Sequence, residues 1–238
     1  MNKKGIINKI LSTTKLSDSE ILQSKGKIYT FLNPVSYLEA IKQKDLFNNF
    51  DGIFVDGSIL VAAIRCLYRK KVIRKSFDMT SLAPTLFNYI EKNGKTIYII
   101  ASQKAEIKKA ISIFKEKWPN LNIIGYRNGY FSSEEEIDIE INRIRTSNPD
   151  FLIVGMGVIK QEQFLLKVKK AQINCIGFTC GGFIHQTAHN KIYYYPKWID
   201  SMNLRFLYRM YKEKHTRKRY IQAALIFPLR FIYERFWG

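Results

Sequence analysis

Hydrophobic positions follow two alternating patterns along the chain. Short runs rich in Ile, Val, Phe and Tyr, most with Gly, Asn or Pro nearby, predict β-strands. These runs are residues 27–32, 50–56, 96–102, 122–126, 151–155 and 174–179. Several are apolar at nearly every position, which is typical of strands in a sheet that is covered on both faces.

Amphipathic segments with helical spacing separate these runs. The apolar side chains that share one face of residues 104–118 are Ile107, Ala110, Ile111 and Phe114. Pro119 cannot continue that helix. Residues 134–150 begin acidic and become basic, which suits a helix macrodipole, and Pro149 closes them. The alternation predicts an α/β fold, a Rossmann-like and mostly parallel sheet with helices on both faces.

The alternation ends at about residue 190. Residues 191–238 combine a helical pattern with many aromatic and cationic side chains. We therefore predict an α/β catalytic domain over residues 1–190 and a basic helical C-terminal appendage over residues 191–238. Pro228 predicts an interruption of the terminal helix.

The composition limits the class of protein. A chain of 238 residues with 46% apolar residues is typical of a globular protein with a substantial core. The cysteines Cys66, Cys175 and Cys180 form no Cys-x-x-Cys pair, which favours a reducing compartment. The N-terminal apolar stretch is too short for a signal peptide, and no window approaches the ~20 apolar residues of a membrane span.

The formal net charge of +19 indicates an anionic partner. Nucleic acid, a phosphate-bearing substrate and the inner leaflet of a membrane are all candidates. A generally Lys-rich surface is the alternative. Lys and Arg occur throughout the chain, but in the last 33 residues they are mixed with large aromatic side chains.

A pair of glycines follows the predicted strand at residues 151–155. Ligands of such sheets bind beyond the carboxyl ends of the strands. Gly155 and Gly157 allow a sharp turn and a close approach to a ligand, and Lys160-Gln161-Glu162 follows at a helix start that favours anions. A plain tight turn is the alternative, because the third glycine of a dinucleotide fingerprint is missing.

Two further segments carry charged groups. Asp56-Gly57 follows a strand and precedes a helix, so Asp56 is either a helix N-cap or a general base aimed into a cleft. Arg74 and Asp78 lie near a predicted helix start. They form either a surface ion pair or part of a site in which the Arg74 guanidinium grips a diphosphate.

The order of these segments resembles the WecG/TagA/CpsF family of bacterial glycosyltransferases, from about residue 29 to residue 220. FVDG resembles the family's Ala-Asp-Gly element, and RKSFD resembles its Arg-x-x-Gly-x-Asp element. WPNLNIIGYRNGYF and VGMGVIKQE resemble its Pro-Gly-Leu and Gly-x-Gly-x-Pro-Lys-Gln-Glu elements. CGGF, PKW, LRFLYRM and KRY follow in the family's order.

The resemblance implies an inverting transfer of a sugar from a uridine diphosphate sugar (UDP-sugar) to a lipid-linked saccharide, with Asp56 as the general base. It implies cationic and N–H contacts from Arg74, Lys160 and the Gly155–Gly157 turn to the leaving UDP. Gln161 is expected to orient a sugar hydroxyl. The other positions expected to bind substrate, from their match to the family's motifs, are Thr30, Asn33, Asp78, Glu162, Arg209 and Arg219.

The chain also departs from the family pattern. Ser76 replaces a glycine, Ile159 replaces a proline, and His185 stands where the family usually has Asp. The Arg-Ala-Pro element reads Tyr194-Tyr195-Pro196, and Leu-Glu-Trp reads Leu204-Arg205-Phe206. These departures predict a diverged member whose sugar pocket or acceptor differs.

No metal or cofactor is expected. The chain has no Asp-x-Asp element, and Asp138-Ile139-Glu140 lies in an acidic helical run typical of solvated surface. His185 and His189 are four residues apart, but the sequence places no further metal ligand beside them. The sequence therefore predicts metal-independent transfer, with protein cations in place of an ion.

The basic aromatic appendage is expected to dock on the inner face of the cell membrane, where a lipid-linked acceptor lies. This predicts a cytoplasmic, peripheral protein. Packing of an ordinary amphipathic helix on the core, or a homo-oligomer interface, is the alternative for the appendage.

A nucleic-acid binder and a Rossmann-like methyltransferase or dehydrogenase remain alternatives for the whole chain, although it carries no nucleic-acid recognition motif and no glycine-rich first turn.

Overall fold

The computed structural model describes residues 5–190, 194, 196, 198, 199 and 204–237. Tyr195 and the first residues of the expected appendage, 191–193, lie outside this part. The described chain contains a six-stranded sheet in the order β2-β1-β6-β5-β3-β4, and every strand pair is parallel. The strands are β1 (Ile28–Leu32), β2 (Gly52–Val55), β3 (Thr96–Ala101), β4 (Asn122–Arg127), β5 (Phe151–Gly155) and β6 (Ile176–Thr179). All six predicted strands are confirmed, with ends that differ by at most a few residues.

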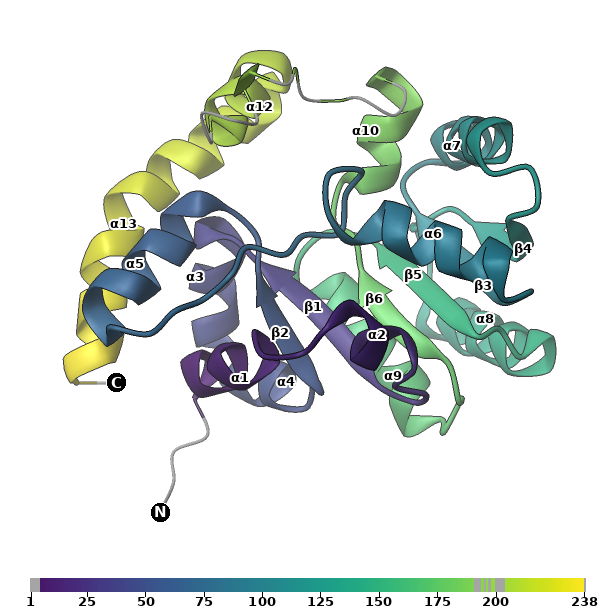
Figure 1. Cartoon of the computed structure of the whole chain (residues 1–238), viewed down its shortest axis with the longest axis horizontal. Helices are drawn as coiled ribbons and strands as arrows, with labels where there is room; N and C mark the ends of the chain where they lie inside the picture. Colours follow the sequence, from purple (N-terminus) through teal and green to yellow (C-terminus); the bar gives the residue numbers. More distant parts are fainter. Residues whose placement is uncertain (1–4, 191–193, 195, 197, 200–203, 238) are drawn as a thin grey trace.

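Both faces of the sheet are covered, as the apolar strands predict (Figure 1). In β5, Leu152 and Val154 belong to one buried cluster and Phe151 and Ile153 to another, because successive side chains point to opposite faces. The first cluster includes residues of α1 (Ile6–Thr13), α3 (Pro34–Lys42), α4 (Lys44–Asn48), α5 (Ser58–Tyr68), α8 (Glu134–Ser147), α9 (Lys160–Lys170) and α13 (Arg217–Phe236). The second includes residues of α2 (Asp18–Leu22), α6 (Leu82–Lys92), α7 (Lys104–Lys117) and α10 (Phe183–Asn190).

The two helices predicted in detail are confirmed. Helix α7 buries Ile107, Ala110, Ile111 and Phe114 and ends at Lys117, ahead of Pro119. Helix α8 has three glutamates in its first turn and an arginine in its last, the charge order that the macrodipole favours. The fold class predicted from the sequence is therefore confirmed.

The predicted interruption at Pro228 is wrong. Helix α13 runs through Pro228 without a break, from Arg217 to Phe236. Proline removes one backbone N–H from a helix, but Ala224, whose carbonyl loses that partner, is exposed to solvent. Phe227 and Phe231 are buried on either side of the proline and hold both halves of the helix on the core.

From residue 204 on, the described C-terminal chain contains α12 (Arg205–Lys212), a short 3₁₀ helix at Lys214–Thr216, and α13. Helix α13 lies along α3 and α5 (Figure 1). The rings of Phe227 and Phe231 make edge contacts with Tyr37, and Phe231 also contacts Tyr68. Among the described helices, none combines the length and apolar character that crossing a bilayer needs.

Candidate active site

A cavity of about 1000 Å³ opens at the carboxyl edge of the sheet. Each strand contributes a residue at or just beyond its carboxyl end, and these are Asn33, Asp56, Ser102, Gly129, Gly155 and Cys180. The cavity is closed on its other side by residues of α12 and α13. Such a position is where parallel α/β sheets bind their ligands.

Asp56 opens into this cavity and does not cap a helix. The N-cap of α5 is Gly57, whose φ of 106° lies in the region that favours glycine, and no side chain caps that helix. The Asp56 carboxylate instead lies 3.5 Å from the Arg74 guanidinium. Burial raises the pKa of Asp56, Arg74 lowers it, and Asp78 raises it again, with a net upward shift.

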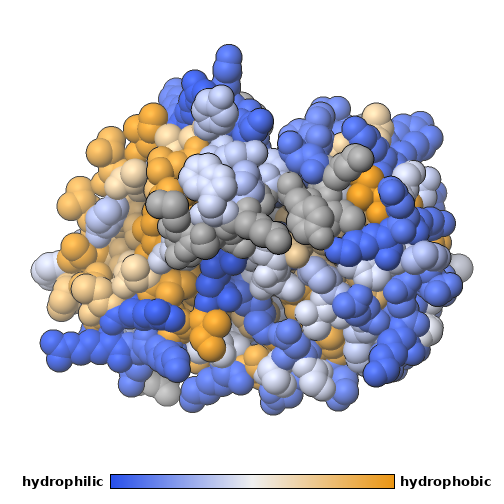
Figure 2. Space-filling view, turned by 45° about the horizontal axis from the view of Figure 1, so that its top comes forward, coloured by the Kyte–Doolittle hydropathy of each residue, from blue (hydrophilic) through white to orange (hydrophobic). Residues whose placement is uncertain are grey.

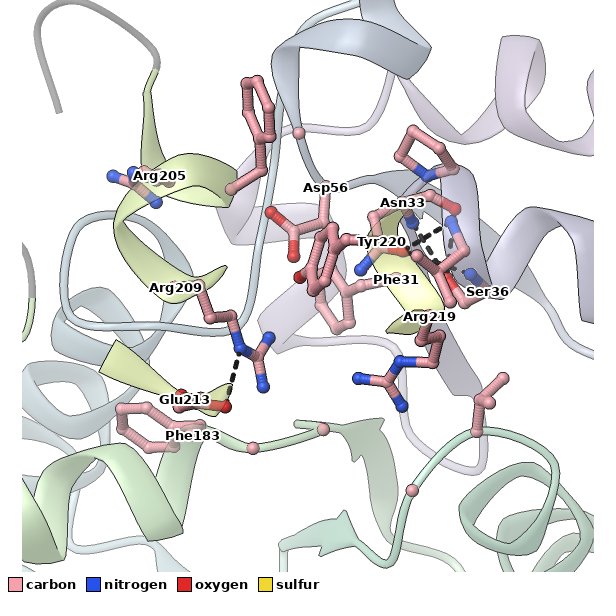
Figure 3. A pocket seen from close by; sticks show the side chains of 18 of the residues that line it. Phe31, Asn33, Ser36, Asp56, Phe183, Arg205, Arg209, Glu213, Arg219 and Tyr220 are labelled. Carbon is pink, nitrogen blue, oxygen red and sulfur yellow. Dashed lines mark hydrogen bonds and ion pairs between the residues drawn. The ribbon is translucent and has the colours of Figure 1, made fainter. Parts of the chain in front are cut away.

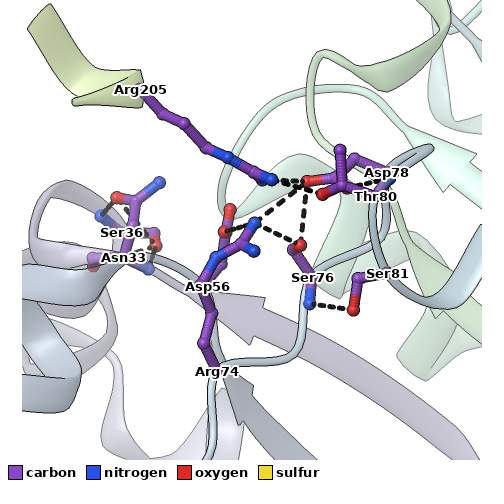
Figure 4. Close-up of polar contacts among 9 residues, drawn as sticks. All are labelled: Asn33, Ser36, Asp56, Arg74, Ser76, Asp78, Thr80, Ser81 and Arg205. Atoms are coloured by element: carbon purple, nitrogen blue, oxygen red, sulfur yellow. Dashed lines mark hydrogen bonds and ion pairs between the residues drawn. The ribbon is translucent and has the colours of Figure 1, made fainter. Parts of the chain in front are cut away.

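Asp78 organises the cations around Asp56 (Figure 4). Its carboxylate lies 3.2 Å from the Arg74 guanidinium and 2.9 Å from that of Arg205. Ser76, which replaces the family's glycine, donates to Asp78 at 2.8 Å and accepts from Arg74 at 2.7 Å. Burial raises the pKa of Asp78, but Arg205, Thr80, Arg74 and Ser76 outweigh it and hold the pKa below its usual value.

The glycine turn after β5 shapes the floor of the cavity. A Cβ at Gly155 would lie 2.6 Å from the Cys180 sulfur and 2.7 Å from the Gly181 carbonyl oxygen, so only glycine fits there. Gly157 has a φ of 83°. Ile159 follows with a φ of 78° and a ψ of −56°, which costs a β-branched residue on the order of 1–3 kcal/mol. A proline, as in the family pattern, could not adopt this φ.

The buried side chain of Glu162 stabilises this turn by hydrogen bonding. Its fully buried carboxylate accepts from the Ile159 N–H at 2.6 Å, from Thr30 at 2.8 Å and from the Gln161 amide at 2.9 Å. Thr179 donates in turn to Thr30 at 2.9 Å. Burial raises the pKa of Glu162, while these hydrogen bonds oppose the shift. The network ties the turn to β1 and β6, so Thr30 and Glu162 support the cavity and do not line it.

The other predicted residues divide between the cavity and the surface. Gln161 lines the cavity, where its side-chain oxygen accepts from the Gly181 N–H at 3.2 Å. Asn33 also lines it, but its side-chain oxygen caps α3 by accepting from Val35 and Ser36. Lys160 is exposed and lies outside the cavity lining.

Two arginines of the C-terminal chain reach the cavity from different helices. Arg209 of α12 and Arg219 of α13 point toward one another across it (Figure 3). The Glu213 carboxylate lies 3.2 Å from the Arg209 guanidinium and accepts from the Tyr194 hydroxyl at 2.7 Å. Tyr194, which replaces an arginine of the family pattern, therefore helps to position Arg209 through Glu213.

Sequence reasoning missed two contributors to the cavity wall. Arg205 lines the cavity and pairs with Asp78. Arg205 lies four residues before Arg209, and this spacing predicts that the two arginines share one face of a helix. Glu106 lines the cavity and contacts His185 and His189, and no sequence signal indicated it. Burial raises the pKa of Glu106, but hydrogen bonds from Ser102, His189, Gln103 and His185 hold it at about 2.

A parallel α/β sheet with a cationic cavity at its carboxyl edge defines a protein built to bind an anionic substrate such as a nucleotide. The model of the glycosyl transferase WecG/TagA/CpsF family matches residues 9–238. The chain belongs to this family. The match supports the glycosyltransferase interpretation over the nucleic-acid-binding and methyltransferase alternatives.

Curated relatives have related activities. The chain is 38% identical over 207 residues to UDP-Gal:alpha-D-GlcNAc-diphosphoundecaprenol beta-1,4-galactosyltransferase of Shigella boydii, with 87% of this chain and 86% of the relative covered. It is 27% identical over 194 residues to N-acetylglucosaminyldiphosphoundecaprenol N-acetyl-beta-D-mannosaminyltransferase of Bacillus subtilis (strain 168), with 79% and 72% covered. Both names describe transfer of a sugar to a saccharide on a lipid diphosphate.

Proposed function

We propose that the chain transfers a sugar from a UDP-sugar to a saccharide carried on a polyprenyl diphosphate, in the synthesis of a cell-surface polysaccharide. The observation that carries the proposal is the opening of Asp56 into a cavity that four arginines also line, namely Arg74, Arg205, Arg209 and Arg219. A carboxylate can accept a proton while the arginines hold a diphosphate. The names of the relatives supply the substrate class.

The proposed reaction is a single displacement with inversion. The acceptor hydroxyl oxygen bonds to the anomeric carbon of the donor as the bond from that carbon to the diphosphate oxygen breaks. Asp56 takes the hydroxyl proton, and the electron pair of the broken bond leaves on UDP. The raised pKa of Asp56 makes its carboxylate a stronger base than an ordinary aspartate.

The arginines stabilise the charge that develops on the leaving diphosphate. Their guanidinium groups are planar and can bind phosphate oxygens in pairs. Asp78 and Glu213 hold Arg74, Arg205 and Arg209 in place before substrate arrives, which is the preorganisation that lowers a barrier. We therefore propose that transfer proceeds without a metal ion.

The test is turnover of a panel of UDP-sugars with a short-chain polyprenyl-diphosphate N-acetylglucosamine, in buffer that contains a chelator. UDP-galactose is the first donor to try, because the relative from Shigella boydii is named for it. Product formation in the presence of chelator is expected. Absence of product with every donor would remove the proposed function, and recovery only on adding Mg²⁺ or Mn²⁺ would remove metal independence alone.

Asp56→Asn is expected to lower the transfer rate by at least about 10²-fold, since general-base catalysis contributes that much or more. Binding of UDP, measured by calorimetry, should stay within a few-fold because Asn keeps the shape of the side chain. Asp138→Asn, an exposed change on α8, is the matched control and should leave both quantities unchanged. Retained turnover in Asp56→Asn would remove Asp56 as the base.

We further propose that α13 rests on the membrane that carries the acceptor. Its side away from the core exposes large apolar residues, including Ile226, Leu229, Ile232 and Phe236, whereas the exposed Ile221 and Leu225 line the cavity. Hydrophobic side chains gather on the side of the molecule where α13 lies (Figure 2). The exposed basic run Arg69, Lys70 and Lys71 follows α5, next to α13, and suits anionic lipid headgroups.

Changing Leu229 and Phe236 together to Asn is expected to weaken sedimentation with phosphatidylglycerol vesicles by at least about fivefold, because both exposed side chains would otherwise enter the interface. Ile139→Asn, a similar change of an exposed residue on α8, is the matched control. Equal vesicle binding by the double variant and the control would contradict docking through α13.

A further inference from the structure

Three potential metal ligands meet at the rim of the cavity. His185 and His189 lie one turn apart on α10, and Glu106 lies in the first turn of α7. The Glu106 Oε1 atom is 2.7 Å from His185 Nδ1 and 2.9 Å from His189 Nε2. All three ligand atoms lie within 4.8 Å of one another. The cluster therefore joins two helices far apart in the sequence.

The spacing of these atoms suits a shared ion. Nitrogen and oxygen ligands of Zn²⁺ lie at about 2.0–2.2 Å from the metal, so two of them in a tetrahedral site are about 3.3–3.6 Å apart. The distances from Glu106 Oε1 to His185 Nδ1 and to His189 Nε2 are shorter than this by roughly half an ångström or more. The third pair, the two imidazole nitrogens, lies within 4.8 Å, so the side chains would have to adjust around Glu106 to share an ion.

The Glu106 carboxylate is already oriented for such a role. Its second oxygen, Oε2, accepts hydrogen bonds from the Ser102 hydroxyl and from the Gln103 N–H, the latter at 3.2 Å. The Oε1 atom is thereby directed at the two imidazoles. Partners of this kind fix metal-binding carboxylates in known sites.

We propose that Glu106, His185 and His189 bind one divalent transition-metal ion at the mouth of the cavity. Two imidazoles and one carboxylate form the ligand set of known three-ligand zinc sites and suit Zn²⁺, Co²⁺ or Ni²⁺ better than Mg²⁺. Glu106 and His185 line the cavity, so a further ligand position can face it. The ion would clamp α7 to α10, and the sugar transfer proposed above is not routed through it.

The test uses the full-length protein without any nucleotide. We expect calorimetry to show one Zn²⁺ per chain, Co²⁺ to give visible absorption bands of a nitrogen- and oxygen-ligated ion, and Zn²⁺ to raise the melting temperature. The variants Glu106→Gln, His185→Ala and His189→Ala should each weaken binding by at least about tenfold, the lower end of what even outer partners of a metal site contribute. His189 is exposed, so its variant tests the site with the least risk to folding.

Two variants are matched controls for adventitious binding. His215→Ala removes the third histidine of the chain, and Cys66→Ser removes its exposed thiol. Both should bind Zn²⁺ and shift in melting temperature as the unaltered protein does. Absence of binding, or binding that survives the three ligand variants, would overturn the proposal and leave the cluster as a hydrogen-bonded group. UDP-sugar turnover is a separate measurement, so the two proposals can fail independently.

Discussion

Asp56 is subject to opposing influences on its pKa. Burial in the cavity raises that pKa, the Arg74 guanidinium lowers it, and the Asp78 carboxylate raises it. The same arginine is a proposed ligand of the diphosphate. In the proposed reaction one residue would both adjust the base and bind the leaving group, and the two proposed roles can be separated by pH.

Replacing Arg74 with Gln is expected to move the acid limb of the profile of kcat/KM against pH to higher pH. Asp56 must be ionised to accept a proton, so activity falls as pH drops through its pKa, which is already above the usual value of 3.8. Loss of Arg74 removes the main lowering influence and raises that pKa further. An acid limb that stays in place or moves to lower pH would contradict this account, and Arg145→Gln on the exposed side of α8 is the control.

At the scale of elements, α13 has two unlike sides. Ala223, Phe227 and Phe231 form a narrow buried stripe at intervals of four residues, and most other side chains of the helix are exposed. The apolar attachment of the helix rests on these three side chains and so depends strongly on each of them, and the Lys44–Glu234 ion pair at 2.7 Å adds a polar contact to α4. Removing residues after about 195 would also uncover Tyr37, which packs against both phenylalanines.

Phe231→Ala is expected to lower the free energy of unfolding by about 3 kcal/mol or more, since the ring is 1% exposed and leaves a cavity when removed. Ile232→Ala, on the adjacent and 40% exposed position, should cost less than about 1 kcal/mol. Denaturant titrations of the two variants provide the comparison. Similar losses in both would show that α13 does not pack through this stripe.

At the scale of the whole molecule, two different interactions would hold the protein on a membrane: the electrostatic attraction of its net charge of +19 and the burial of the apolar side of α13. Charge attraction reaches about one Debye length, which is ~10 Å at 0.1 M salt and ~3 Å at 1 M. Burial of apolar side chains is not screened in this way. The two contributions to docking should therefore differ in their response to salt.

Sedimentation with phosphatidylglycerol vesicles is expected to fall by at least about tenfold between ~0.1 M and ~1 M NaCl, because the attraction of Lys and Arg for anionic lipid is screened. Vesicles of phosphatidylcholine alone should bind weakly at both concentrations and serve as the control. Binding that is equal for the two lipids, or insensitive to salt, would show that the net charge does not direct the protein to the membrane.

Much of the site could be predicted from the sequence because its parts follow strands. Asp56, Gly155 and Gly157 lie at strand ends, and the parallel sheet brings these ends to one edge. Spacing did not decide the roles of single residues. Spacing left Asp56 open between a helix cap and a base, and it gave no sign that Lys160 is exposed while Glu162 is buried.

The sequence by itself determined the strands, the helix order, the family and the residues available for an anionic site, because period, turn chemistry and motif order are local properties. Only the tertiary structure decided which distant groups meet. Arg205 pairs with Asp78 across 127 positions, and Glu106 meets His185 across 79. Such pairs depend on how helices pack on the sheet, where burial and charge act through space and leave no fixed spacing in the chain.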